Sequence, residues 1–358
     1  MQRLRLLAVI MGVGLFALGS IPAYPEAPQF DGKPAWSINF SPERLVVSVS
    51  PTRQTIQIGG SAATILGAGV DTVVNDRYRK DLNAAIGDYV PLDVLESALE
   101  AGLSSAAGAN VERVAPMGTS AGYTSVREAE QARLNQLNKE GYGAVIDLKG
   151  LAGVFTEDAL LFIKISGEAY NTETGKERWD DTVFATAEPA LLSNKPGDPT
   201  QRMMARITRP KLTPAGERLA RWLENDGELF KKEFDRAAEL IVAGLLQSLG
   251  FEDTIDGTLV LARTALESKD EDRALELFEK AIQEGDRSEN ALNGRVVALA
   301  RSKQVDDAIA AGRDLTTVYP EYGPGWLNLA WLLAVEKGDA DAARPVYEQA
   351  QTLGMAPV

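Results

Sequence analysis

The chain has 358 residues and contains no histidine or cysteine, which excludes Ser-His-Asp and Cys-His catalysis, the usual zinc ligand sets and haem ligation through these side chains. Its 51 acidic and 37 basic residues give a formal net charge of -14, and an anionic protein of this kind repels nucleic acid and acidic lipid. A chain of this length is expected to form two domains.

The first residues have the pattern of an export signal. Arg3 and Arg5 form a positive region, residues 6–18 are uncharged, and small residues follow. An uncleaved membrane anchor is the rival interpretation, because the uncharged run continues to Tyr24 and is then just long enough to cross a bilayer. Residues 1–23 are therefore expected to be a signal peptide or an N-terminal anchor, and both place the rest of the chain in a bacterial periplasm.

Residues 24–250 have the alternating elements of a mixed α/β domain. A strand pair is expected on either side of Ser50-Pro51-Thr52, and a helix begins at the capping box formed by Ser125 and Glu128. The fold class expected is α+β, a mixed α/β sandwich with a mainly antiparallel sheet. The expected strands are 44–49, 54–58, 111–115, 144–148, 160–170 and 178–185, and the expected helices are 61–86, 91–105, 125–140 and a broken helical region from Thr213 to Gly250.

The last of these helices carries a continuous apolar stripe. Its apolar residues recur every three or four positions, so one face of the helix must pack against another element. The three strands between residues 144 and 185 are expected to form the sheet that covers this face. The stripe consists of Phe230, Phe234, Ala237, Ile241, Leu245 and Leu249.

A hairpin between the last two strands carries a family resemblance. The turn is Glu173-Thr174-Gly175-Lys176, and the second strand contains Trp179. This hairpin and the order of elements resemble a periplasmic family that includes the curli-secretion channel protein, the lipoprotein activators of penicillin-binding proteins and the N-terminal domain of the Tol translocation protein. The resemblance implies a domain that docks on an envelope assembly. Trp179 is expected to fill the space between sheet and helix rather than to stack on a ligand.

The C-terminal residues 251–358 repeat themselves with a period of about 34. The recurring positions are Ala274, Phe278 and Ala281, then Ala308, Gly312 and Leu315, then Ala343, Tyr347 and Ala350; Trp326, Leu329, Ala330 and Leu333 lie between them. This pattern resembles the tetratricopeptide repeat, a pair of antiparallel helices. The resemblance implies an all-α solenoid of about three units that begin at Ile255, Glu289 and Gly323.

In repeats of this type the first helix of each unit lines a concave groove. The resemblance therefore assigns partner binding to Arg263, Asn290, Asn293, Val297, Leu327, Asn328 and Trp331. Asn293 and Asn328 are expected to hold an extended peptide through its backbone. Trp331 is expected to be exposed in the groove while Trp326 is buried, with packing of Trp331 against the middle domain or a C-terminal extension as the alternative.

Few residues of the chain match a known catalytic pattern. Ser120 lies in the string G-x-S-x-G, but the chain has no histidine to act as its base and the next helix begins only at Ser125, so Ser120 is expected to be inert. Asp180, Asp181 and the acidic residues in 224–228 are expected to be solvated, because a carboxylate pair is catalytic only when both face one cleft. No catalytic residue, metal site or cofactor is expected.

These observations predict a non-enzymatic protein-protein interaction or scaffold component of a bacterial envelope assembly that binds a partner protein through the repeat groove. One alternative is a subunit of an envelope secretion or motor complex that oligomerises through the middle domain. Another is a carboxylate-dependent cell-wall hydrolase. Nucleic acid is not an expected partner, and membrane contact is expected only through residues 1–24 if they are not cleaved.

Overall fold

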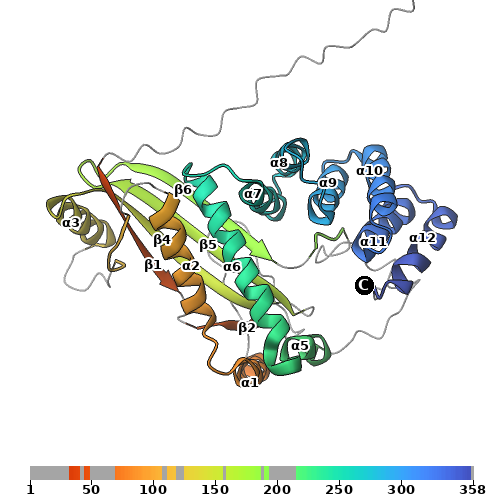
Figure 1. Ribbon diagram of the computed structural model, residues 1–358, viewed down its shortest axis with the longest axis horizontal. Coiled ribbons are helices and arrows are strands. Elements are labelled where there is room, and N and C mark those ends of the chain that lie inside the picture. The colour runs from red at the N-terminus through yellow and green to blue at the C-terminus, as the bar shows by residue number, and fades with distance from the viewer. Residues whose placement is uncertain are drawn as a thin grey trace, which may run out of the picture.

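The architecture is described from a computed structural model (Figure 1). The expected export segment, the strand at 54–58, the helix start at Thr213 and Ser120 lie outside the described residues. None of the helices in the described part of the chain is long and apolar enough to cross a membrane. The structure describes residues 32–40, 44–48, 69–106, 111–117, 125–155, 159–186, 189–192 and 215–355.

The N-terminal half is built on a mixed six-stranded sheet with the order β3-β1-β4-β5-β6, in which β2 also pairs with β4. Strands β4, β5 and β6 form an antiparallel meander, whereas β1 pairs in parallel with β3 and β4, and β2 in parallel with β4. The strands are β1 (Lys33–Phe40), β2 (Val46–Ser48), β3 (Glu112–Arg113), β4 (Tyr142–Phe155), β5 (Leu160–Asn171) and β6 (Glu177–Thr186).

The expectation of a mainly antiparallel sheet is confirmed only in part, because three of the five strand pairings are parallel, although the two antiparallel pairings, β4-β5 and β5-β6, are the longest. The sequence did not predict β1. This strand lies between β3 and β4, and six of its eight residues are buried, so it lacks the alternation of a half-exposed strand. Strand β2 then continues along the edge of β4 that β1 occupies, so Val46–Ser48 pairs with β4.

Strand β4 is much longer than the predicted 144–148 because its glycines accept close neighbours. A side chain at Gly150 would collide with the ring of Phe40, and one at Gly153 would collide with the main chain of Val46. These glycines interrupt the apolar pattern in the sequence. In the sheet they allow β1 and β2 to lie against β4.

Helices cover both faces of the sheet (Figure 1). Helix α2 (Pro91–Ala106) and helix α6 (Glu228–Ser248) lie side by side on one face, with α1 (Gly69–Ile86), α5 (Ala215–Leu223) and the short η1 (Glu224–Gly227) at one end. Helix α3 (Val126–Lys139) packs on the opposite face, because Ala35 and Val145 contact it while their neighbours Trp36 and Ile146 belong to the core on the first face.

The apolar stripe of α6 packs as the sequence predicts. All six of its residues are buried, and α6 contacts both β5 and β6. Trp179 packs against this layer, and its indole nitrogen donates a hydrogen bond of 3.0 Å to the Ser248 hydroxyl. The predicted packing role of Trp179 is therefore confirmed, as are the β5-β6 hairpin, the Ser125 cap and the helix break at Asp226-Gly227.

The C-terminal half is helical, and its helices begin where the repeat pattern places them. Helix α7 (Ile255–Glu267), α9 (Glu289–Arg301) and α11 (Gly323–Trp331) start at the three predicted residues. Each is followed by a second helix, α8 (Glu271–Gln283), α10 (Val305–Val318) and α12 (Ala340–Thr352), and a π-helical turn η2 (Leu332–Glu336) extends α11. Consecutive helices pack against each other along the whole series.

The two halves share one hydrophobic core. A side chain at Gly244 of α6 would collide with Val260 of α7, so these helices approach closely. The buried Gln247 amide donates a 2.8 Å hydrogen bond to Thr258, and the main-chain nitrogen of Phe184 in β6 donates a 3.0 Å bond to the hydroxyl of Thr264 in α7. Helix α7 is therefore anchored to both α6 and the edge strand of the sheet.

We expect Phe234→Ala to lower the free energy of unfolding by about 3–5 kcal/mol, because the ring is fully buried between α6 and its neighbours and packs on Phe230. Denaturant unfolding of the full chain measures the change. Leu229→Ala on the exposed side of the same helix is the matched control and should cost under about 1 kcal/mol. Equal losses for the two variants would contradict the packing of the stripe.

Candidate functional site

A short segment that follows the last strand of the sheet is hydrogen-bonded to helices α9 and α11. We call residues 189–192 the crossing segment. The side-chain amide of Asn293 on α9 donates a 2.8 Å hydrogen bond to the carbonyl oxygen of Ala190, and the amide of Asn328 on α11 donates a second bond of 3.0 Å to the same oxygen. The main-chain nitrogen of Leu192 donates a 2.9 Å bond to the side-chain oxygen of Asn328. Figure 1 shows this segment beside α9 and α11.

The two asparagines form a single buried unit, which we call the asparagine site. Each is 1% exposed, and the Asn328 amide also donates a 2.9 Å bond to the side-chain oxygen of Asn293. A buried amide is stable only when its polar atoms are paired, and here the crossing segment supplies the remaining partners. All three bonds to the segment involve its main-chain atoms, so they do not depend on the side chains of the segment.

The sequence predicted the backbone contacts of Asn293 and Asn328 but not their occupant. The bound segment belongs to the same chain. Val297 and Leu327, which were expected to face a partner, are buried in the protein core. Asn290 is exposed, and Asn290 and Arg263 both line a pocket described below.

Trp331 is buried, which agrees with the packing alternative and not with an exposed position in a groove, and Trp326 is less buried than expected. Trp331 is only 9% exposed and belongs to the main hydrophobic cluster, whereas Trp326 is partly exposed and donates a 2.8 Å hydrogen bond to the carbonyl of Pro320. Trp331 follows Asn328 by three residues, so both lie on the same face of α11. Asn328 contacts the crossing segment, and both Asn328 and Trp331 are buried in this structure.

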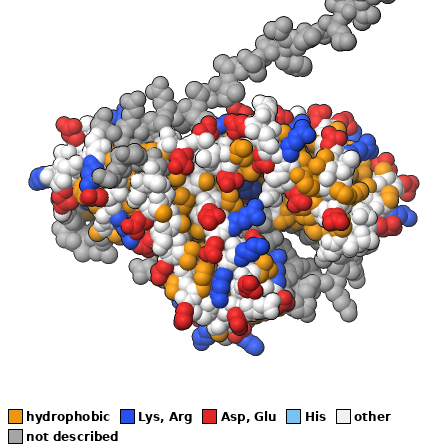
Figure 2. Space-filling view, in the orientation of Figure 1, with side chains coloured by type: hydrophobic (Ala, Val, Ile, Leu, Met, Phe, Trp, Pro, Cys, Tyr) orange, Lys and Arg blue, Asp and Glu red, His pale blue; other side chains and the backbone are white. Residues whose placement is uncertain are grey.

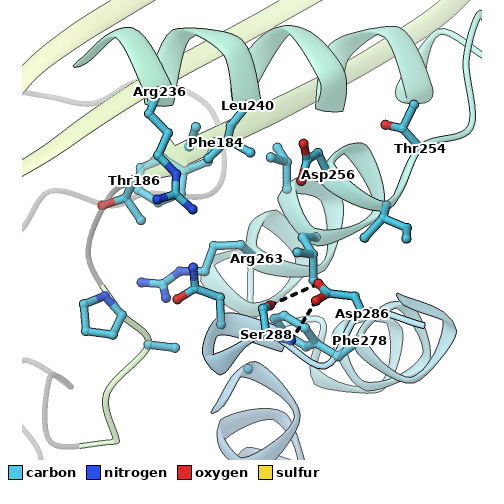
Figure 3. A pocket seen from close by; sticks show the side chains of 18 residues that line it. Phe184, Thr186, Arg236, Leu240, Thr254, Asp256, Arg263, Phe278, Asp286 and Ser288 are labelled. Carbon is cyan, nitrogen blue, oxygen red and sulfur yellow. Dashed lines mark hydrogen bonds between the residues drawn. The ribbon is translucent and has the colours of Figure 1, made fainter. Parts of the chain in front are cut away.

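A pocket of about 560 Å³ lies where the sheet meets the helices (Figure 3). We call it the junction pocket. Pro189 and Ala190 of the crossing segment form part of its wall, so the pocket adjoins the asparagine site. Phe184, Leu240, Leu259 and Phe278 supply apolar wall, and Arg236, Arg263, Asp256, Asp286, Ser288 and Asn290 supply polar groups from α6, α7, α9 and the turn before α9.

The charged side chains of the junction pocket differ in how many hydrogen-bond and ion-pair partners they have. Asp286 accepts bonds of 2.7 Å from the Ser288 main-chain nitrogen and 3.1 Å from its hydroxyl. Arg263 forms a 3.0 Å ion pair with Glu267 through one terminal nitrogen, but its buried Nε has no hydrogen-bond partner. Arg236 makes no ion pair with another described residue.

A third arginine, Arg301 at the end of α9, lies near Arg263 and Glu267. Burial lowers the pKa of Arg301 below its usual value; the charge of Glu267 opposes this effect and that of Arg263 adds to it. Arg301 donates a 2.9 Å bond to the carbonyl of Leu266. Glu267 therefore lies near two guanidinium groups, and Glu271 also lies near that of Arg301.

The acidic residues singled out in the sequence do not assemble into a site. Asp181 accepts hydrogen bonds from the Ser248 hydroxyl and the Thr182 main-chain nitrogen, so it fixes α6 to β6. Glu224, Asp226 and Glu228 are exposed, as expected for solvated charges. Within the described residues, no three acidic side chains lie close enough together to hold a metal ion.

No protein-family model matches this chain, and neither does any curated protein. The two family resemblances therefore depend on the residues quoted for them. Ala190, Leu192 and Arg236 were not among the site residues expected from the sequence. The run Pro189-Ala190-Leu191-Leu192 is an apolar stretch opened by a proline, which could have indicated an extended buried segment.

We expect Asn328→Ala to speed hydrogen exchange of the Leu192 amide by about tenfold or more, because this amide loses its acceptor. The same variant leaves buried polar groups unpaired and should lower the free energy of unfolding by about 1–3 kcal/mol. Exchange measured residue by residue tests the first effect. Asn290→Ala is the control, since Asn290 is exposed on α9, and it should leave Leu192 exchange unchanged.

Proposed function

We propose that this protein is a non-enzymatic interaction or scaffold component of a bacterial envelope assembly, and that its helical half binds an extended polypeptide segment. The observation that carries the proposal is the contact of Asn293 and Asn328 with the main chain of Ala190 and Leu192. A buried pair of amides that binds only the backbone of an extended segment can accept segments of many different sequences. Side-chain selectivity then comes from neighbouring pockets.

The packing of the C-terminal helices supports a tetratricopeptide-like solenoid. Helices α7, α9 and α11 start at the residues where the three units begin, and the small residues Ala274, Ala308 and Ala343 are buried between helices. Gly294 of α9 lies directly against the ring of Phe278, which is the close approach that stacked helix pairs require.

The crossing segment acts in this proposal as an internal ligand. It is tethered to β6, so its effective concentration at the asparagine site is of the order of millimolar or higher. A partner segment binds when it replaces the crossing segment or when an assembly step withdraws it. The protein would thereby hold its binding site closed until it meets its partner.

A peptide added in trans tests this exchange. Leu192→Pro removes the hydrogen that is donated to Asn328, and Ala190→Asp places a charge at a buried position, so the double variant should release the crossing segment. Hydrogen exchange of residues 189–192 verifies the release. We expect a labelled peptide of residues 186–194 to bind this double variant saturably and to bind the wild-type chain much more weakly.

Matched variants separate specific binding from adhesion. Adding Asn293→Ala and Asn328→Ala to the released variant should weaken the peptide about tenfold or more, because the backbone bonds are lost, whereas adding Asn138→Ala, an exposed position on α3, should not. A released variant that binds no peptide, or binds it equally without the two asparagines, would show that the asparagine site only joins the two halves of the fold.

Export is the second part of the proposal, supported by Arg3, Arg5 and the uncharged run that follows. If the segment is cleaved, mass spectrometry of a periplasmic fraction should find a mature N-terminus between Ser20 and Pro25. If it is an anchor, the intact chain should fractionate with the membrane. An intact chain in the soluble cytosolic fraction would contradict both forms.

A further inference from the structure

We propose that the junction pocket is a binding site for a carboxylate carried on an apolar body, with Arg236 and Arg263 as the residues that hold the carboxylate. This inference goes beyond the proposed function and does not rest on it, because the pocket exists while the crossing segment is in place. Pro189 and Ala190 are part of its wall.

The first argument is the convergence of two cations from different helices. Arg236 extends from α6 and Arg263 from α7, and Figure 3 shows both side chains directed to the same side of the pocket, near Thr186. Asp256 lies on the opposite side in that view. Two guanidinium groups in a hollow repel each other unless an anion lies between them, and a carboxylate can accept hydrogen bonds from both.

The second argument is unused hydrogen-bonding capacity. Arg263 is 20% exposed at its side chain, and its Nε donor is buried without an acceptor. Its one ion-pair partner, Glu267, also lies near Arg301. Arg236 has no ion pair within the described part of the chain. The Arg263 Nε is a buried donor without an acceptor, which a bound anion would satisfy, whereas Arg236 is exposed to solvent and would add a second positive charge beside the anion.

The third argument is the composition and size of the remaining wall. Phe184, Leu240, Leu259 and Phe278 form an apolar surface, and a volume of about 560 Å³ lies in the range of about 300–1,000 Å³ that is usual for small-molecule sites. Asp286 is hydrogen-bonded to Ser288 and forms no ion pair with Arg236 or Arg263. A simple inorganic anion would leave the apolar wall exposed to water. A carboxylate on an apolar body would pair with the arginines and also cover the apolar wall.

Such a ligand has two sources, a free amphiphile or the terminal carboxylate of a bound polypeptide. Calorimetric titration of the wild-type chain with octanoate and with N-acetylphenylalanine represents these sources, and octanol and N-acetylphenylalanine amide are the uncharged controls. We expect one or both acids to bind at a single site, at least about tenfold more tightly than their uncharged counterparts. Binding of octanoate alone would identify a site for an amphiphile. Tighter binding of N-acetylphenylalanine than of octanoate would identify a site for a peptide terminus.

Variants then assign the site. Arg236→Gln and Arg263→Gln should each weaken the acid about tenfold or more, while Arg344→Gln, an exposed position on α12, should not. If Arg263→Gln fails to fold because its pair with Glu267 is lost, the exposed Arg236 decides alone. Acids that bind no better than their uncharged controls, or that bind Arg236→Gln as well as Arg344→Gln, would overturn the assignment.

Discussion

The position of helix α6 is the constraint on which the rest of the structure depends. One face of this helix presses a continuous apolar stripe on the sheet, and its C-terminal end meets α7 at Gly244, where no side chain separates the two helices. Gln247 adds a buried polar contact to α7. A helix that belongs to both halves leaves no hinge between them, so the hydrophobic core runs from the sheet into the C-terminal helices.

The candidate sites follow from this anchoring. Because α7 is fixed on β6, residues 189–192, which follow the end of β6 closely in the sequence, lie against α9 and α11. A short crossing then brings Ala190 to Asn293 and Asn328, whose amides would otherwise be buried without partners. The same geometry leaves a space between the crossing segment, α6 and α7, which is the junction pocket.

The two sites complement each other chemically. The asparagine site contacts only main-chain atoms and therefore tolerates many sequences, while the junction pocket offers charge and apolar wall that distinguish one ligand from another. The chain as a whole carries a net charge of -14, and acidic side chains are spread over the face drawn in Figure 2, so its general field repels anions at long range. An anionic ligand must gain its affinity from local contacts with Arg236 and Arg263.

The sequence by itself determined the elements with strong local signals. The α6 stripe, the hairpin at Gly175 and the starts of α7, α9 and α11 depend on spacing, capping and turn residues that act within a few positions. Only the tertiary structure decided what covers each face. Strand β1 pairs in parallel with β4 and is buried on both sides, so its sequence shows no alternation. Likewise the sequence identified Asn293 and Asn328 as residues that contact a backbone, but the partners of their hydrogen bonds lie in a segment more than 100 residues away in the chain. The spacing of apolar residues in the sequence indicates which face of a helix or strand a side chain lies on. The residues that this side chain contacts depend on long-range packing.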